Sequence, residues 1–162
     1  MISKIDRISS HEQFSSLFKP GVLAVCSKTV YKHFIKDATK GIPNVYIFSD
    51  VKPEPDENVI LEAFEFSKEL PIQKIIAVGG GSVIDVAKLL NIKLSFPDVP
   101  LLNWTSTPIP KLKFPLSAVP TTAGTGSEVT KYAVFYHEKE NRKVTIKDEE
   151  MIPENIFLYP EL

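Results

Sequence analysis

The chain has 162 residues, 19 of them basic and 20 acidic, so its net charge at neutral pH is −1. That length suits one domain with a sizeable core, and its 43% hydrophobic and 24% charged residues are ordinary for a globular protein. No segment concentrates basic and aromatic residues, which argues against a nucleic-acid partner. The single cysteine, Cys26, excludes a disulfide framework and lies in an apolar run, where we expect a small core residue.

The first ten residues lack the apolar segment of a secretion signal. The longest apolar run, over residues 75–84, is interrupted by three glycines, whereas a membrane span needs about 20 consecutive apolar residues. We therefore expect a cytoplasmic protein with no membrane partner.

Short apolar runs alternate with longer segments of helical period, which is typical of an α/β domain. In chain order the pattern predicts a strand over 22–26, a helix over 29–38, a strand over 45–48, a helix over 57–70, a strand over 74–78 and a helix over 83–94. Five prolines between residues 97 and 115 predict an extended connection. Further strands are expected over 116–119 and 132–136, followed by a charged turn over 138–142 and a return strand from Val144 to Ile146.

This order of strands and helices implies a right-handed, doubly wound, mostly parallel sheet of the Rossmann-like kind. We expect a single domain over residues 1–162.

The most informative segment is Gly79-Gly80-Gly81-Ser82, which links a buried strand directly to a helix. Glycines let the backbone adopt unusual dihedral angles and approach a ligand closely. The free N–H groups at the start of the helix then favour a phosphate. The loop matches neither the GxGxxG pattern, because position 84 is Ile84, nor a P-loop.

A purely structural explanation is also open for this segment. Ser82 and Asp85 form a capping-box-like start to the helix, although a single glycine would suffice for the turn. Lys88 is either a ligand-facing charge or a solvated partner of Asp85, three residues earlier.

A second small-residue loop follows the strand over 116–119. It runs from Pro120 to Thr130 and holds five hydroxyl side chains and two glycines. Such donors can bind phosphate, ribose or carboxamide groups, although an ordinary Ser/Thr-rich turn is the alternative. Two loops of this kind at the carboxyl ends of parallel strands favour a dinucleotide-binding crevice.

The combination of Gly79-Gly80-Gly81-Ser82, Asp85, Ala87 and Lys88 with Pro-Thr-Thr-Ala-Gly-Thr-Gly-Ser-Glu at 120–128 resembles the iron-containing (group III) alcohol dehydrogenases. The resemblance runs from about Val22 to Leu162. It implies the cofactor-binding domain of an NAD(P)-dependent, metal-containing alcohol dehydrogenase, with the dehydroquinate synthase-like N-terminal fold. It also implies an alcohol or aldehyde substrate and a homo-oligomer.

The resemblance further implies which residues bind NAD or NADP. The glycine loop would hold the pyrophosphate, and Lys143 would lie near the ribose. The expected cofactor-binding residues are Ser27, Gly79, Gly80, Gly81, Ser82, Asp85, Thr121, Thr122, Thr125, Ser127, Thr130 and Lys143.

Two positions depart from the family. Ser27 stands where an aspartate is usual after the first strand, and Glu54-Pro55 replaces the usual Asn-Pro after the second. An acidic residue there grips the ribose of NAD and repels the 2′-phosphate of NADP. Ser27 therefore predicts that NADP(H) is accepted at least comparably to NAD(H), unless Glu54 reaches the same pocket.

The family's Fe²⁺ or Zn²⁺ is held by a C-terminal helical domain, which we expect to be missing from this chain. The histidines His11, His33 and His137 lack the spacing of a helical metal site, so we assign no metal ligand and no catalytic residue. His33 and His137 are expected to be exposed, and the chain alone is expected to be inactive. The alternatives are a glycerol dehydrogenase or dehydroquinate synthase-like relative, or a stand-alone nucleotide-binding module.

Overall fold

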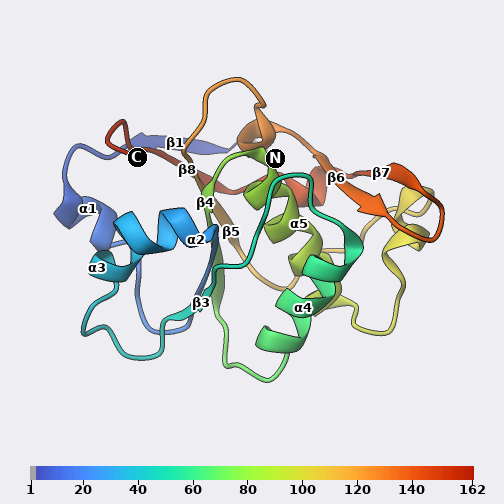
Figure 1. Cartoon of the computed structure of the whole chain (residues 1–162), viewed down its shortest axis with the longest axis horizontal. Helices are drawn as coiled ribbons and strands as arrows, with labels where there is room; N and C mark the ends of the chain where they lie inside the picture. The colour runs from blue at the N-terminus through green and yellow to red at the C-terminus, as the bar shows by residue number, and fades with distance from the viewer. Residues whose placement is uncertain (1–2) are drawn as a thin grey trace.

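The computed structural model describes residues 3–162 and contains a six-stranded, all-parallel sheet in the order β1-β8-β5-β4-β2-β3 (Figure 1). Its strands are β1 (Lys4–Arg7), β2 (Val22–Cys26), β3 (Tyr46–Phe48), β4 (Lys74–Gly79), β5 (Leu116–Pro120) and β8 (Asn155–Leu158). A separate antiparallel hairpin is formed by β6 (Tyr132–His137) and β7 (Arg142–Lys147).

Helices cover both faces of the sheet. The helical elements are α1 (His11–Ser15), α2 (Lys28–Val30), η1 (Tyr31–Ile35), α3 (Lys36–Ala38), α4 (Glu57–Ser67), α5 (Gly81–Ser95), η2 (Leu101–Thr105), η3 (Ser127–Val129) and η4 (Glu149–Met151). Alternate residues of each buried strand point to opposite faces. In β4, Ile75 and Ala77 join the core under α4, α5 and the hairpin, while Ile76 and Val78 join the core under α1 and α2.

The strand order reverses between β2 and β4. The chain passes from β2 to β3 at one edge, returns to β4 on the other side of β2, and then continues through β5 to β8. Ligands of open α/β sheets bind outside the carboxyl ends of the strands at such a switch point. The segments that follow β2, β4 and β5 therefore meet where a ligand is expected.

The predicted doubly wound α/β fold is confirmed, and most predicted elements lie within a few residues of their observed bounds. The predicted helix over 29–38 is continuous from Lys28 to Ala38, with a π-helical turn over Tyr31–Ile35. The proline-rich segment over 97–115 contains one short 3₁₀ turn, η2. Cys26 is buried in the core, as expected.

Two strands of the sheet were not predicted. The edge strand β1 and its neighbour β8 were missed, because each is only four residues long and only partly buried. The predicted strand over 132–136 and the predicted return strand from Val144 to Ile146 are observed as β6 and β7, which pair with each other and form a sheet of their own. Among residues 3–162, no helix combines the length and the apolar character that a membrane crossing requires.

Candidate functional site

Helix α5 begins at the glycine loop without a side-chain cap. Gly80 is the N-cap residue, in an extended conformation, and no side chain of the described chain bonds to the first turn. The expected capping box of Ser82 and Asp85 is therefore wrong, because both residues lie inside the helix rather than at its cap. The main-chain N–H groups of Gly81 and Ser82 find no acceptor among residues 3–162, as is usual at a helix start.

The three glycines are required for close approach rather than for unusual dihedral angles. None of them has a positive φ, which corrects part of the expectation from the sequence. A Cβ atom on Gly80 would lie 3.0 Å from the Thr122 hydroxyl oxygen, and one on Gly81 would lie 3.0 Å from that of Thr125. The second loop thus rests directly against the start of α5, with two hydroxyl groups beside free N–H groups.

The second loop turns sharply at two glycines. Gly124 and Gly126 have φ values of 127° and 65°, a region that residues with a side chain rarely adopt. Gly126 leads directly into the short turn η3.

Lys88 fastens this loop to α5. Its side chain is fully buried, and Nζ donates to the carbonyl oxygens of Ser127 at 2.7 Å, Thr130 at 2.7 Å and Tyr132 at 2.8 Å. Burial lowers the pKa of the Lys88 ammonium to about 8, while the charges of Asp85 and Glu128 raise it. Both interpretations of Lys88 from the sequence, a ligand-facing charge and a solvated partner of Asp85, are therefore wrong.

Asp85 holds the hairpin one turn before Lys88. Its Oδ2 accepts a hydrogen bond from the main-chain N–H of Val134, and its buried Oδ1 has no partner among the described residues. Burial raises the pKa of the Asp85 carboxyl, whereas the Val134 N–H and the Lys88 charge lower it. Asp85 and Lys88 together attach β6 and the loop before it to α5.

A cavity of about 480 Å³, the glycine-loop cavity, opens at the switch point. Four segments line it, one at the carboxyl end of each of the strands β2, β3, β4 and β5. The expected site residues that it brings together are Ser27, Gly79, Gly80, Gly81, Ser82, Thr121, Thr122 and Thr125. The cavity is also lined by Val51, Lys52 and Pro53. These residues were not among the expected site residues, although their position directly after the predicted strand over 45–48, observed as β3, could have indicated them.

A second cavity of about 300 Å³, the hairpin cavity, shares Gly81, Ser82 and Thr125 with the first. It brings together three further expected residues, Asp85, Ser127 and Lys143, beside β6. The Lys143 ammonium is exposed and lies 2.7 Å from the carboxylate of Glu54, which lowers the pKa of that carboxyl. Glu54 therefore lines this cavity and does not line the one that holds Ser27.

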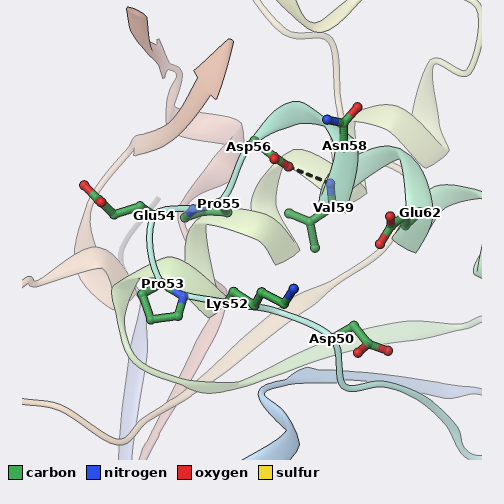
Figure 2. A pocket seen from close by; sticks show the side chains of 9 residues that line it. All are labelled: Asp50, Lys52, Pro53, Glu54, Pro55, Asp56, Asn58, Val59 and Glu62. Atoms are coloured by element: carbon green, nitrogen blue, oxygen red, sulfur yellow. Dashed lines mark hydrogen bonds between the residues drawn. The ribbon is translucent and has the colours of Figure 1, made fainter. Parts of the chain in front are cut away.

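A third cavity of about 470 Å³, the acidic cavity, lies between the segment after β3 and helix α4. Figure 2 shows Glu54 projecting away from Asp50 and Glu62, and Lys52 extending toward the side where those two carboxylates lie. Asp56 caps α4 by accepting from the N–H of Val59 at 3.0 Å. Four carboxylates around one lysine repel a phosphate, so this cavity is unsuited to a nucleotide.

Two of the expected site residues have a structural role. Ser27 has this role in addition to lining a cavity, and Thr130 has it without lining either cavity. Ser27 caps α2 by accepting from the Val30 N–H at 3.2 Å, and its neighbour Lys28 pairs with Asp50 at 2.6 Å. Thr130 lines neither the glycine-loop cavity nor the hairpin cavity, and it contributes its carbonyl oxygen to Lys88.

The histidines do not gather. His33 is exposed as expected, but His137, the last residue of β6, is only 6% exposed, and its Nε2 lies 3.2 Å from the carboxylate of Glu57 at the start of α4. The expectation of an exposed His137 is therefore wrong. Among residues 3–162, no three His, Cys, Asp or Glu side chains lie close enough together to hold a metal ion.

This fold, with a glycine loop at the switch point and a hydroxyl-rich loop beside it, defines a nucleotide-binding α/β domain. The model of the iron-containing alcohol dehydrogenase family matches residues 3–160. The chain belongs to this family, whose members are oxidoreductases, and the resemblance stated from the two loops is confirmed.

Solved structures and curated proteins agree with this assignment. The iron-containing alcohol dehydrogenase of Thermococcus thioreducens matches the whole chain with a TM-score of 0.88 at 28% identity, over 46% of its own chain. Sulfoacetaldehyde reductase of Bifidobacterium kashiwanohense, solved in complex with NAD⁺, matches 98% of the chain and 45% of its own, with a TM-score of 0.82 at 26% identity. The mitochondrial hydroxyacid-oxoacid transhydrogenase of Xenopus laevis is 38% identical over 128 residues, and that of Bos taurus is 40% identical over 116 residues.

These matches cover 75% and 68% of this chain but only 28% and 25% of the two transhydrogenases. The chain thus spans about a quarter of the length of these curated relatives. The expectation of a cytoplasmic protein is corrected, because the curated relatives are mitochondrial enzymes. The lack of an apolar secretion signal could not distinguish the two compartments, since mitochondrial transit peptides are amphipathic rather than apolar.

Proposed function

We propose that the chain binds NAD(H) or NADP(H) with the pyrophosphate across the start of helix α5. The observation that carries this proposal is the close contact between the glycine loop and the second loop. It places the unpaired N–H groups of Gly81 and Ser82 beside the hydroxyl groups of Thr122 and Thr125. N–H groups at the positive end of a 15-residue helix, together with neutral hydroxyl donors, form a favourable site for a diphosphate.

The two adjoining cavities provide for the two ends of the cofactor. The adenosine would lie in the glycine-loop cavity beside Ser27 and Val51, and the nicotinamide half in the hairpin cavity beside Asp85 and Lys143. Bound NAD(P) would supply the acceptor and donor of a hydride. The contribution of the described residues is to bind and orient it.

We propose a hydroxyacid and an oxoacid as the substrate pair, rather than a simple alcohol. The curated transhydrogenases share 38–40% of their residues with this chain, against 25–28% for the alcohol dehydrogenase and reductase structures. We also propose the mitochondrion of its cell as its compartment, which subcellular fractionation tests. The described residues form no site for the iron in the family's name, so the proposed chemistry includes no step at a metal that they bind.

The second candidate is an alcohol dehydrogenase, which the similar solved structures favour. A transhydrogenase keeps its cofactor through both half-reactions, because the hydride leaves one substrate and is delivered to the next. An alcohol dehydrogenase must release reduced cofactor at each turnover. Slow dissociation of NAD(H) from the purified chain therefore favours the transhydrogenase, and rapid exchange favours the alcohol dehydrogenase.

Titration of the purified chain with NADH, followed by nicotinamide fluorescence, tests the binding site. The Gly81→Ala substitution places Cβ 3.0 Å from the Thr125 hydroxyl, and Gly81→Val adds further bulk at the same place. We expect affinity to fall in the order parent, Gly81→Ala, Gly81→Val, with little change in far-ultraviolet circular dichroism. Equal affinity in all three proteins would place the site elsewhere.

A further inference from the structure

Lys88 is the one lysine of the described chain whose side chain is fully buried. An ammonium group has three N–H donors, and all three are used here, on the carbonyl oxygens of Ser127, Thr130 and Tyr132. These carbonyls belong to the second loop and to the first residue of β6. Hydrogen bonds to a charged donor are among the strongest in a folded protein.

The part of the loop that Lys88 holds has little other support. The other hydrogen bonds of residues 125–130 are short-range ones within the loop. Val129 N–H donates to the Gly126 carbonyl at 3.0 Å, and the bonds from Ser127 N–H to the Thr125 hydroxyl and from Thr130 N–H to the Ser127 carbonyl are both 3.5 Å long. Thr125 nevertheless lines both cavities, and Ser127 lines the hairpin cavity. Lys88 therefore determines how closely the second loop lies against the glycine loop.

Lys88 lines neither of the two cavities, so it acts through the loop and not by contact with a ligand. The charged groups that face it are Asp85 on its own helix and Glu128 on η3, while β6 presents the main-chain carbonyl of Tyr132. Two carboxylates near the ammonium favour its charged form, and burial opposes it.

We infer that Lys88 is a positioning residue whose positive charge holds the second loop in the cofactor-binding conformation. This inference rests on the proposed function, in which the chain binds NAD(P). Deprotonation would leave one of the three carbonyl oxygens without a donor, because a neutral amine keeps two N–H groups, and replacement of the side chain would leave all three without one. Either change would allow the loop to move away from the start of α5.

The test uses Lys88→Met, which keeps most of the apolar side chain, and Lys88→Arg, which keeps a positive charge. The matched control is Lys93→Met on the same helix, because Lys93 also donates to main-chain carbonyls, those of Pro97 and Val99, away from the loop. In NADH titrations at pH 7 we expect Lys88→Met to bind about tenfold or more weakly, since three buried acceptors lose a charged donor. Lys88→Arg should recover part of the affinity, and Lys93→Met should bind like the parent.

The pH dependence provides a readout that a purely structural role of the side chain would not change. Because the pKa of Lys88 is about 8, the NADH affinity of the parent should fall as the pH rises from 7 to 9. The affinity of Lys88→Met should stay flat over the same range. This measurement on the parent needs no folded variant.

Amide hydrogen exchange in the cofactor-free chain separates this inference from the proposed function. We expect residues 125–132 to exchange faster in Lys88→Met than in the parent or in Lys93→Met. A parent that fails to bind NADH would overturn the proposed function, while the exchange result still decides whether Lys88 holds the loop. Unchanged exchange in Lys88→Met, or an NADH affinity equal to that of the parent, would overturn the role of Lys88.

Discussion

Asp85 Oδ2 lies 3.1 Å from the main-chain nitrogen of Val134 and attaches the hairpin to helix α5. The two residues are 49 positions apart in the sequence, so this bond joins the glycine-loop helix to the wall of the hairpin cavity. The Asp85 carboxylate is largely shielded from water, and this burial raises the pKa of Asp85.

Substitution of Asp85 tests what this bond contributes to stability. We expect Asp85→Ala to lower the free energy of unfolding by about 1–2 kcal/mol, because the Val134 N–H loses its acceptor. Asp85→Asn keeps an amide oxygen that can accept the bond and avoids the cost of a buried charge, so it should lose less. Urea denaturation of the three proteins gives the comparison, and equal losses in both variants would show that the bond to Val134 is not responsible.

Lys88 makes stability depend on pH in a defined direction. Its pKa is about 8 in the folded chain and near 10.5 when unfolded, so the native state binds fewer protons than the unfolded state between these values. The free energy of unfolding of the parent, relative to Lys88→Met, should therefore rise from pH 8 to 10 by on the order of 1–3 kcal/mol and stay level below pH 8, where both states are protonated. A relative stability that falls over pH 8–10 would contradict the depressed pKa.

The pH experiment requires the difference from Lys88→Met because Cys26 titrates in the same region. Burial raises the pKa of the Cys26 thiol to about 12, so the unfolded chain ionises first. Stability from this group is present below pH 9 and is lost as the pH rises toward 12. Both proteins share Cys26, and its contribution cancels in the difference.

Ser27 makes cofactor preference testable with little disturbance of the fold. Its hydroxyl caps α2, and aspartate is an equally good N-cap, so Ser27→Asp should fold normally. The added carboxylate would face the glycine-loop cavity, where it should repel a 2′-phosphate by about 1–3 kcal/mol and shift preference from NADP(H) to NAD(H) by roughly ten- to a hundredfold. Lys28→Met is the matched control, because the Lys28 ammonium pairs with Asp50 and does not line this cavity.

Parallel titrations with NADPH and NADH measure this preference. We expect the parent to bind both cofactors comparably, because Glu54 pairs with Lys143 at the hairpin cavity and no acidic side chain lines the glycine-loop cavity beside Ser27. A parent that rejects NADPH, with Ser27→Asp changing nothing, would disprove this role of Ser27.

The fold could be predicted from the sequence where periodicity and burial coincide. Residues 22–26 and 74–78 are apolar at every position or nearly so, as central parallel strands require, and the structure places them side by side. The strands β1 and β8 were not predicted, because four-residue strands such as Lys4–Arg7 carry too few buried positions to show a period.

The sequence was enough to predict the two loops of the candidate site, but not the contacts that hold them together. Glycine and threonine content indicated Gly80, Gly81, Thr122 and Thr125, because small residues and hydroxyl groups carry a local signal. The role of Lys88 depends on carbonyl oxygens 39 to 44 residues away, which no local pattern reveals. The same reason explains why Asp85 was expected as a helix cap and is instead a long-range acceptor.

Two-dimensional ¹H–¹⁵N NMR of the labelled chain, titrated with NADH, locates the bound cofactor residue by residue. We expect the amide signals of Gly80, Gly81 and Ser82 to move earliest and furthest, because their N–H groups would meet the pyrophosphate, with Thr122 and Thr125 next. Amides lining the acidic cavity, such as that of Asn58, should stay in place. If saturating NADH leaves the glycine-loop signals unmoved, or shifts only the signals of residues that line the acidic cavity, the proposed position of the cofactor is wrong.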